Sequence, residues 1–171
     1  MASAADRRIF WVTGVAVLVA DVVTKLLAES LLTHRMPTAV IGDYVQLRLV
    51  YNNCAAFGLC LGDYSRWIFF GLALVALVVL GSMVRTTRPD DRFRLVALAL
   101  VSAGAVGNVI DRLRSAQGVV DFLDVGIGSL RWPTFNVADS GITVGAIALA
   151  ISLWLEGRTH EHAKEARAAE P

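Results

Sequence analysis

Residues 93–110 read FRLVALALVSAGAVGNVI, an apolar stretch with the length of a membrane span. An α-helix needs about 17–25 predominantly apolar residues to cross the hydrocarbon core. Small side chains are frequent in this stretch, and in lipid they allow the backbones of two helices to approach closely. We therefore expect this helix to be the central packing helix of a bundle. Its small residues are Ala97, Ala99, Ser102, Ala103, Gly104, Ala105 and Gly107.

Three further stretches, at about residues 9–28, 67–84 and 137–155, are also long and apolar enough to span a membrane. The chain of 171 residues is 56% hydrophobic and only 18% charged, whereas soluble domains have about 45–50% apolar and about 25% charged residues. The sequence therefore predicts one membrane-embedded domain over residues 1–171, all-α within the membrane. Residues 157–171 form a polar tail, which we expect to be a frayed helix or disordered.

Basic residues flank the predicted spans unevenly. They gather before the first span, in the short link between the second and third spans, and after the fourth span. Because Lys and Arg are enriched in cytoplasmic loops, both termini and this link are predicted to be cytoplasmic. The two longer connections, about residues 29–66 and 111–136, then face outward. The basic residues are Arg7, Arg8, Arg85, Arg88, Arg92, Arg94, Arg158, Lys164 and Arg167.

The two outward connections carry signs of a small β-sheet. Residues 45–49 read VQLRL, an alternation of apolar and polar side chains that is typical of a half-buried strand. In the second connection, Ile127, Leu130 and Trp132 could supply another strand or an anchor at the membrane interface. The pattern favours a small sheet that rests on the membrane surface.

Asp21 and Lys25 are ionisable residues inside the first predicted span. A charge at the centre of a span costs at least about 2.5–3.5 kcal/mol on insertion scales, so each one needs a reason. An acid four residues before a base is the favourable order for a helical ion pair. We interpret the two as a local pair in which Lys25 reaches the outer interface. The alternative is that they hold a functional site or grip a substrate.

Asn108, Asp111 and Arg112 lie at the outer end of the third predicted span. Asn108 and Asp111 are three residues apart and therefore share one helix face. Arg112 can reach a carboxylate or a lipid headgroup. These residues could form part of a site, or no more than an interfacial cap with a local ion pair.

Asp121 lies between two apolar neighbours in the second outward connection, where it could cap a turn. At the start of the fourth span, Asn136 could be a helix N-cap and Asp139 a first-turn acid favoured by the helix dipole. Each residue has a structural explanation when taken alone. Together, however, the polar residues converge on one depth of the outer leaflet, which predicts a functional site. The converging residues are Asn52, Asn108, Asp111, Asp121, Asn136 and Asp139.

The residue types limit the chemistry of such a site. The chain lacks a Gly-x-Ser-x-Gly elbow and a His-Glu-x-x-His motif. His34, His160 and His162 are too few and badly placed for zinc, so we expect no metal and no cofactor. Cys54 and Cys60 have no intramembrane histidine to activate a thiol, and we expect free thiols rather than a disulfide across the short loop between them. The net charge of +1 implies no attraction to nucleic acid.

A pair of carboxylates remains as the chemical group. Two close carboxylates cannot both ionise, so one keeps a proton while the other stays charged. The charged one can activate a water molecule and the protonated one can hydrogen-bond a substrate carbonyl, as in aspartic proteases. From the residues alone, Asp111 is as fair a partner for Asp139 as Asp121 is.

Five short motifs follow one another in the chain in an order that resembles a known family. They are Asp21-x-x-Thr24-Lys25, Asn52-x-x-Ala55-Ala56-Phe57, Gly107-Asn108-x-x-Asp111-Arg112, Val120-Asp121-Phe122 and Phe135-Asn136-x-Ala138-Asp139. With these motifs the chain resembles the bacterial lipoprotein signal peptidases (signal peptidase II), which are membrane aspartyl endopeptidases. The resemblance covers nearly the whole chain.

The resemblance implies a role for each matching residue. Asp121 and Asp139 would be the catalytic pair, and Asp21 with Lys25 would be structural or supporting. The polar surround that orients the pair and the substrate would be Asn52, Asn108, Asp111, Arg112 and Asn136. The implied fold has four transmembrane helices, a small extracytoplasmic sheet and a surface helix.

The resemblance also implies a reaction and a location. The substrate would be a prolipoprotein whose lipobox cysteine already carries diacylglycerol, and the bond on the amino side of that cysteine would be cut. The enzyme would lie in the bacterial cytoplasmic (inner) membrane with its active site at the outer face, in contact with membrane lipid and without a nucleic-acid partner. We expect a monomer, and inhibition by the cyclic peptide globomycin.

Two positions depart from the family's pattern. Cys54 stands where the family usually has glycine, which leaves the backbone less free there, and Tyr51 stands where relatives often have arginine. Two other readings of the chain are a small proton-coupled transporter or channel that uses intramembrane carboxylates, and a non-catalytic assembly protein. A transporter would be expected to show inverted repeats or broken helices near the midplane, whereas this chain has four unequal spans with its acids at one face.

Overall fold

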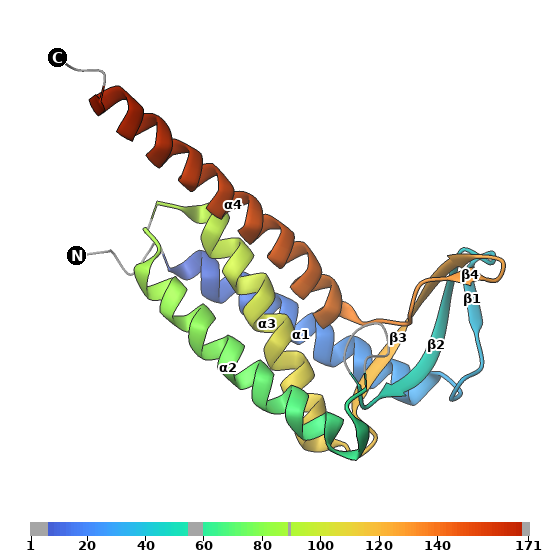
Figure 1. Cartoon of the computed structure of the whole chain (residues 1–171). Helices are drawn as coiled ribbons and strands as arrows, with labels where there is room; N and C mark the ends of the chain where they lie inside the picture. The colour runs from blue at the N-terminus through green and yellow to red at the C-terminus, as the bar shows by residue number, and fades with distance from the viewer. Residues whose placement is uncertain (1–6, 55–59, 89, 169–171) are drawn as a thin grey trace.

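The structure is a computed structural model that describes residues 7–54, 60–88 and 90–168, with side chains described as far as Thr159. Four helices form a bundle and four short strands form an antiparallel sheet at one end of it (Figure 1). The helices are α1 (Arg8–Leu31), α2 (Ser65–Thr86), α3 (Arg92–Arg114) and α4 (Val137–Ala168). The strands are β1 (Thr38–Ile41), β2 (Val45–Asn52), β3 (Val119–Ile127) and β4 (Leu130–Arg131).

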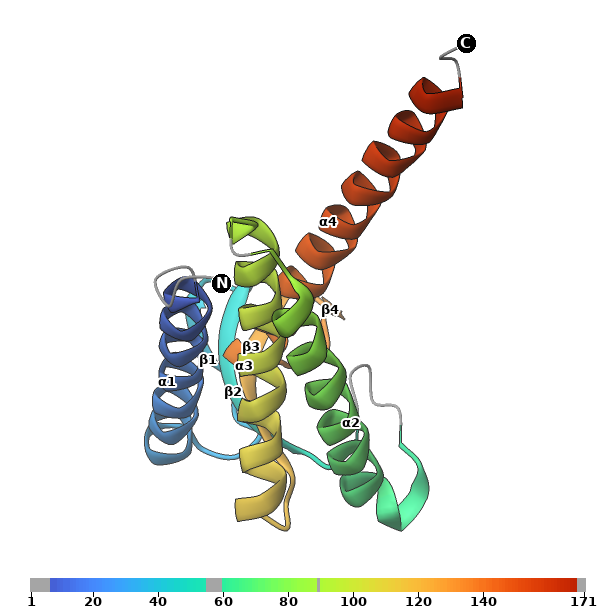
Figure 2. The same ribbon diagram turned by 90° about the vertical axis from the view of Figure 1, so that its left-hand side faces the viewer.

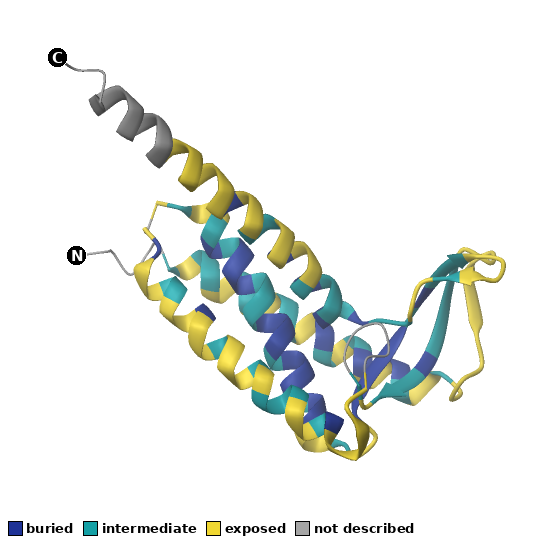
Figure 3. Cartoon of the chain, viewed as in Figure 1, coloured by how far each residue is buried: buried dark blue, intermediate teal, exposed yellow. Residues whose placement is uncertain are grey.

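All four helices are long and apolar enough to cross a membrane, as the sequence predicts. Helix α3 is the most buried of them and packs against α1, α2 and α4 (Figure 3). The other helices expose large apolar side chains along their outer faces, for example Val12, Val78 and Trp154. Such faces suit lipid and not water. The prediction that residues 93–110 form the central packing helix is therefore confirmed.

Glycines allow α4 to lie close to α3. A Cβ atom on Gly104 would collide with the carbonyl oxygen of Ala138 and with Ile142. From the other helix, a Cβ on Gly145 would lie only 2.8 Å from the carbonyl oxygen of Ala97. Close backbone contact of this kind is how small residues hold membrane helices together.

The sheet lies at one end of the bundle, opposite the start of α1, the C-terminal part of α4 and the α2–α3 link (Figure 1). Its strand order is β1-β2-β3-β4, and each strand pairs antiparallel with the next. Strand β2 contains the predicted strand at 45–49 and continues to Asn52. In the second connection Leu130 lies in β4, and Ile127 ends a strand that already begins at Val119.

Strand β3 places Asp121 opposite Val50 of β2. The interpretation of Asp121 as an acid that caps a turn is therefore wrong. The apolar residues on both sides of it are buried in the strand, and the backbone of this segment is paired with β2. Because side chains of a strand alternate between its two faces, the register of β3 decides which side of the sheet carries the acid.

Two other expectations change with the structure. The polar tail continues α4 as a helix to Ala168 and projects beyond the rest of the bundle (Figure 2). Cys54 and Cys60 form a disulfide, so the expectation of free thiols is wrong. Their Cα atoms are 4.7 Å apart, within the range of about 4.4–6.8 Å that a disulfide requires.

Two expectations concern the segments outside the four long helices. The resemblance implies a surface helix, and the described residues outside the long helices contain one short 3-10 helix, η2 (Gly62–Tyr64). Ala55, Ala56 and Phe57 of the second motif lie outside the described residues, and so do the side chains of His160 and His162.

The close contact at Gly104 gives a first prediction. Gly104→Ala should lower the free energy of unfolding in detergent by about 1–3 kcal/mol, because the added methyl group meets backbone atoms that cannot move aside. The matched control is Gly81→Ala in α2, where a Cβ meets nothing within 4 Å. Thermal melting of both variants checks this expectation. Equal melting temperatures for the two variants would contradict the close packing of α3 on α4.

Candidate active site

A buried ammonium group lies at the centre of the polar residues. Lys25 Nζ lies 2.8 Å from Asp21 Oδ2 and 2.8 Å from Asp111 Oδ2, and it donates a hydrogen bond of 3.1 Å to Asn108 Oδ1. The three donors of a lysine are thus matched by three acceptors. Lys25 is only 2% exposed, so the expectation that it reaches the outer interface is wrong. Its partners on α3 hold it inside the bundle.

The two acids around Lys25 also hold neighbouring elements. Asp21 Oδ1 accepts a hydrogen bond of 2.8 Å from the backbone N–H of Ala138, in the first turn of α4. Asp111 accepts from Arg114 Nε at 3.1 Å and from the N–H of Val120 in β3 at 3.3 Å. The cluster therefore ties α1, α3, α4 and β3 together. Both acids therefore bind partners that hold the fold together.

Asn108 connects this cluster to Asp139. Its Oδ1 accepts from Lys25, and its Nδ2 donates to Asp139 Oδ1 at 2.8 Å. A lysine ammonium offers only donors, so it must face the amide oxygen. The orientation of the Asn108 amide is thereby fixed, and its N–H groups point toward Asp139.

Asn136 connects the two acids of the predicted pair. Its Nδ2 donates to Asp121 Oδ1 at 2.8 Å, and its Oδ1 accepts from the backbone N–H of Asp139 at 2.8 Å. In return, Asp139 Oδ2 accepts from the backbone N–H of Asn136 at 3.3 Å. This reciprocal arrangement is a capping box at the start of α4. The prediction of Asn136 as an N-cap is confirmed, and the same residue also contacts Asp121.

Asn52 completes the contacts of Asp121 from the neighbouring strand. Its Nδ2 donates to Asp121 Oδ2 at 3.1 Å. Asp121 is 2% exposed, whereas Asp139 is half-buried. Among the described side chains, no basic group forms an ion pair with either acid. Asp121 and Asp139 thus differ from Asp21 and Asp111, whose charges are matched by Lys25.

The environment of Asp121 favours its protonated form. Burial and the nearby carboxylate of Asp139 raise its pKa to about 7, although the hydrogen bonds from Asn52 and Asn136 act in the opposite direction. Desolvation and a like charge are the two causes that keep one acid of a close pair neutral. The direction of this pKa shift is the one expected if one acid of the predicted pair stays neutral.

Arg112 is buried beside the acids but does not bind them. It donates to two backbone carbonyl oxygens, that of Asn108 at 3.1 Å and that of Cys54 at 3.3 Å. The ion pair of Asp111 forms with Lys25 and Arg114 instead of with Arg112. Arg112 therefore links the end of β2 to α3 and adds positive charge near the acid pair.

A cavity of about 760 Å³ opens beside the acid pair. It lies between α2, α3 and α4 and reaches the sheet, and its wall is mostly apolar. Asn52, Asn108, Asp121 and Asp139 line its polar part. The apolar part includes Leu72, Ala76, Leu80, Val101, Ala105, Ile142 and Val144. A long apolar ligand could lie in this space with one polar group against the acids.

Sequence reasoning missed one buried acid. Asp124 of β3 is 2% exposed and binds Arg131 Nε at 2.6 Å and Arg48 Nε at 3.3 Å. Its position three residues after Asp121 was the available signal, because a second acid in an apolar strand also needs a partner. The structure explains it as an ion-pair network that holds β2, β3 and β4 together. Among the described residues, no group of His, Cys, Asp and Glu is arranged to hold a metal ion.

The fold and the site define a class, namely a four-span membrane protein with a buried pair of aspartates beside an apolar cavity. The family model described as signal peptidase (SPase) II matches residues 13–155. The chain belongs to the signal peptidase II family and is a membrane aspartyl endopeptidase of the signal peptidase II type. The alternative of a transporter or channel finds no support in these comparisons.

Individual relatives agree with this family. The chain is 42% identical to the lipoprotein signal peptidase of Hydrogenovibrio crunogenus, over 90% of this chain and 88% of the relative. It is 39% identical to the lipoprotein signal peptidase of Geobacter metallireducens, over 86% and 91% of the two chains. A solved bacterial membrane enzyme superposes with a TM-score of 0.77 at 31% identity, covering 86% of this chain and 88% of the other.

The raised pKa of Asp121 predicts how stability depends on pH. The unfolded chain has an ordinary aspartate pKa of about 3.9, so the folded state binds the proton more tightly. The contribution of protonated Asp121 to stability is therefore full below about pH 4 and is lost as pH rises toward about 7. Asp121→Asn cannot titrate at this position. We expect the melting temperature of the wild type to fall, relative to that of Asp121→Asn, between these pH values.

Melting curves of both proteins in the same detergent across this pH range provide the measurement. The comparison cancels the titration of groups that the two proteins share. A difference in melting temperature that stays constant from pH 4 to pH 8 would show that Asp121 has an ordinary pKa.

Proposed function

We propose that Asp121 and Asp139 are the catalytic pair, and that the enzyme removes the signal peptide from diacylglyceryl-modified prolipoproteins by cutting before the lipobox cysteine. One observation carries this proposal. The two acids share the bridging residue Asn136, have no basic ion-pair partner among the described side chains, and line the polar part of an apolar cavity. The curated relatives named above are lipoprotein signal peptidases.

We propose different roles for the two acids. Asp139 lies at the N-terminus of α4, where the helix dipole favours a negative charge, and it accepts hydrogen bonds from Asn108 and from the N–H of Asn136. We therefore assign the charged carboxylate to Asp139. Asp121 is the more buried acid and keeps the proton below about pH 7.

The reaction then follows the general acid–base scheme of two carboxyl groups. Asp139 accepts a proton from a water molecule as its oxygen attacks the scissile carbonyl carbon. Asp121 donates its proton to the carbonyl oxygen, and a tetrahedral intermediate forms. When the intermediate collapses, the proton held by Asp139 passes to the leaving amine, and Asp121 recovers its proton from the new carboxyl group. No net proton is left on either acid.

The position of the site explains how a membrane helix can be cut. A signal peptide inside lipid keeps its backbone hydrogen bonds, which must open locally before a peptide bond can be attacked. At the outer end of the bundle, water is available and the end of a substrate helix can fray. The two acyl chains of the substrate would lie against the apolar cavity wall, where each buried methylene contributes about 0.8 kcal/mol.

The distribution of charge supports an orientation in the membrane. Arg88, Arg92 and Arg94 lie at or near the α2–α3 link, at the end of the bundle opposite the sheet (Figure 1). By the positive-inside tendency, this end and both termini would face the cytoplasm of the bacterial cell. The acid pair would then face outward from the cytoplasmic membrane. We propose that the enzyme acts there as a monomer.

Cleavage by purified variants tests the catalytic pair. We expect wild type in detergent to cut a diacylglyceryl-modified lipobox peptide before the cysteine. Asp121→Asn and Asp139→Asn should each lower kcat by about a thousandfold or more, because each removes one half of the acid–base pair. The matched control is Asp124→Asn, which changes an acid of the same strand that binds arginines outside the cavity. Mass spectrometry identifies the cut bond.

The control should retain cleavage per folded molecule. If Asp121→Asn or Asp139→Asn cuts as fast as wild type, the assignment of the pair is wrong. If wild type fails to cut the modified peptide, the proposed substrate is wrong.

Asp21→Asn separates structural support from catalysis. Asp21 contacts Lys25 and the first turn of α4, but not the acid pair. The change should lower the free energy of unfolding by about 1–3 kcal/mol, since Lys25 keeps Asp111 as a partner and is not left as an unpaired buried charge. Turnover per folded molecule should fall less than stability does. A large loss of kcat with unchanged melting would place Asp21 in the catalytic machinery.

A further inference from the structure

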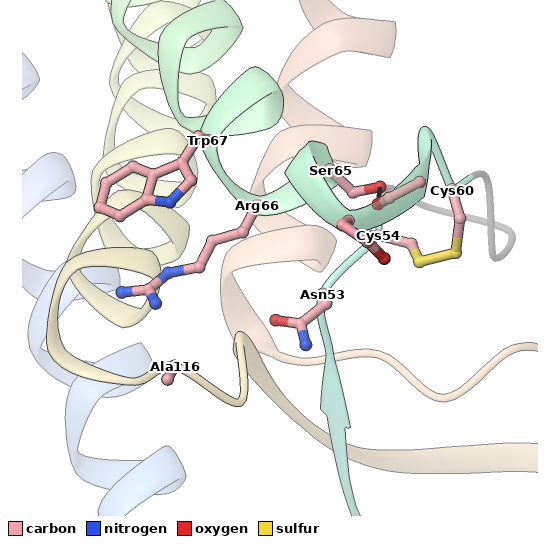
Figure 4. Close-up of a pocket in the computed structure, with 9 residues that line it drawn as sticks. Asn53, Cys54, Cys60, Ser65, Arg66, Trp67 and Ala116 are labelled. Carbon is pink, nitrogen blue, oxygen red and sulfur yellow. Dashed lines mark hydrogen bonds between the residues drawn. A yellow bond between two sulfur atoms is a disulfide. The ribbon is translucent and has the colours of Figure 1, made fainter.

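A disulfide joins the end of β2 to the segment before α2 (Figure 4). Cys54 lies two residues after the end of β2, and Cys60 lies two residues before the start of η2. Neither cysteine has a role in the acid–base scheme above. The bond nevertheless lies close to the site, because Cys54 lines the cavity that also contains Asp121 and Asp139.

The backbone of Cys54 contacts two residues of the site. Its N–H donates to Asn52 Oδ1 at 2.9 Å, and its carbonyl oxygen accepts from Arg112 Nη2 at 3.3 Å. Because the amide oxygen of Asn52 is occupied by an N–H donor, its Nδ2 is turned toward Asp121, to which it donates at 3.1 Å. The position of Cys54 therefore decides the orientation of an amide that binds a proposed catalytic acid.

The other end of the disulfide is attached to a firmly held helix start. The N–H of Leu61 donates to Ser65 Oγ at 2.7 Å, and Ser65 Oγ donates to the carbonyl oxygen of Gly62 at 2.6 Å. Arg66 Nε donates to the carbonyl oxygen of Arg112 at 2.6 Å, which joins the start of α2 to the end of α3. The disulfide thus links Cys54 to the start of α2, which is joined by a hydrogen bond to the end of α3.

We propose that the Cys54–Cys60 disulfide is a redox-sensitive positioning element of the active site, which holds Asn52 toward Asp121 and Arg112 toward the end of β2. The inference rests on the proposed catalytic pair. In the oxidised chain, the covalent bond fixes the Cys54 backbone and with it the amide of Asn52. In the reduced chain, the described contacts that still hold Cys54 are its hydrogen bonds with Asn52 and Arg112, and Asn52 donates to Asp121 for a smaller fraction of the time.

The disulfide is accessible to a small reductant. Cys60 is exposed and Cys54 is half-buried, and both line a second cavity of about 370 Å³ beside Ser65 and Arg66 (Figure 4). A dithiol reductant supplies two electrons and two hydrogen atoms. The Cys54–Cys60 bond breaks, two cysteine thiols form, and the reductant becomes a disulfide.

Loss of the Asn52 contact should change the titration of Asp121. This hydrogen bond favours the charged carboxylate, so weakening it raises the pKa of Asp121 above its present value of about 7. The charged groups that face Asp121 are Asp139 of α4, Lys25 of α1 and Arg112 of α3. Among the described contacts, Arg112 is the one of these charged groups that bonds to a cysteine of the disulfide, and it donates to the Cys54 carbonyl oxygen. The shift therefore reports mainly on Asn52.

The experiment compares oxidised and dithiothreitol-reduced wild type, purified as the full chain in detergent, on a diacylglyceryl-modified lipobox peptide. Alkylation and mass spectrometry confirm the thiol state. Reduction should lower kcat about 3- to 10-fold with a smaller change in KM, since one ordinary hydrogen bond is weakened. The alkaline limb of the kcat–pH profile should move up by about 0.4–1 pH unit.

The matched control is the Cys54→Ser/Cys60→Ser double variant, which should resemble reduced wild type and should not respond to dithiothreitol. If the disulfide has a structural role alone, its reduction will lower the melting temperature and leave kcat and the pH profile of the folded enzyme unchanged. That result overturns the inference and leaves the proposed function intact. Oxidised wild type that never cuts the peptide overturns the proposed function, and the inference with it.

Discussion

The buried ammonium of Lys25 is the contact on which the rest of the structure depends. It neutralises Asp21 of its own helix and Asp111 of α3, and it donates to Asn108 of α3. A lysine inside a membrane bundle is costly unless its charge and all three donors are matched, so α1 and α3 can pack only in the register that supplies these acceptors. Gly107 makes this register possible, because a side chain there would collide with Asp21.

The same contact explains why the proposed catalytic pair keeps a proton. Lys25 is occupied by Asp21 and Asp111, which leaves Asp121 and Asp139 to be stabilised by the amides of Asn52, Asn108 and Asn136. An amide donor stabilises a charged carboxylate less strongly than an ammonium group does, and a second carboxylate nearby opposes ionisation. Fixed amide donors around a charge that develops during the reaction are also an efficient form of electrostatic stabilisation. In the proposed mechanism, the chemistry thus depends on a neutral acid, Asp121, and a charged one, Asp139.

The sequence predicts the bundle well because lipid imposes a simple rule on length, apolarity and small residues. It predicts the polar residues at one depth for the same reason. It does not predict how they pair, since partners such as Lys25 with Asp111 come from different helices and their contact depends on packing. Periodicity alone could not choose between Asp111 and Asp121 as the partner of Asp139. The structure offers a physical ground for the choice, because Asp111 is bound by Lys25 and Arg114, whereas the side-chain partners of Asp121 among the described residues are amides. The sequence also does not predict the Cys54–Cys60 disulfide, since two cysteines alone do not show whether a turn brings them together.

In the proposed mechanism, Asp121 holds the single proton of an acid pair that has no basic ion-pair partner among the described side chains. Infrared spectroscopy of the carboxyl C=O stretch, followed against pH in wild type and in the two Asp→Asn variants, measures this proton. We expect one protonated carboxyl band in wild type that disappears with a midpoint near pH 7, is absent from Asp121→Asn, and is still present at acid pH in Asp139→Asn. A wild type without a protonated carboxyl at pH 6, or a band that is lost in Asp139→Asn but kept in Asp121→Asn, would contradict the account.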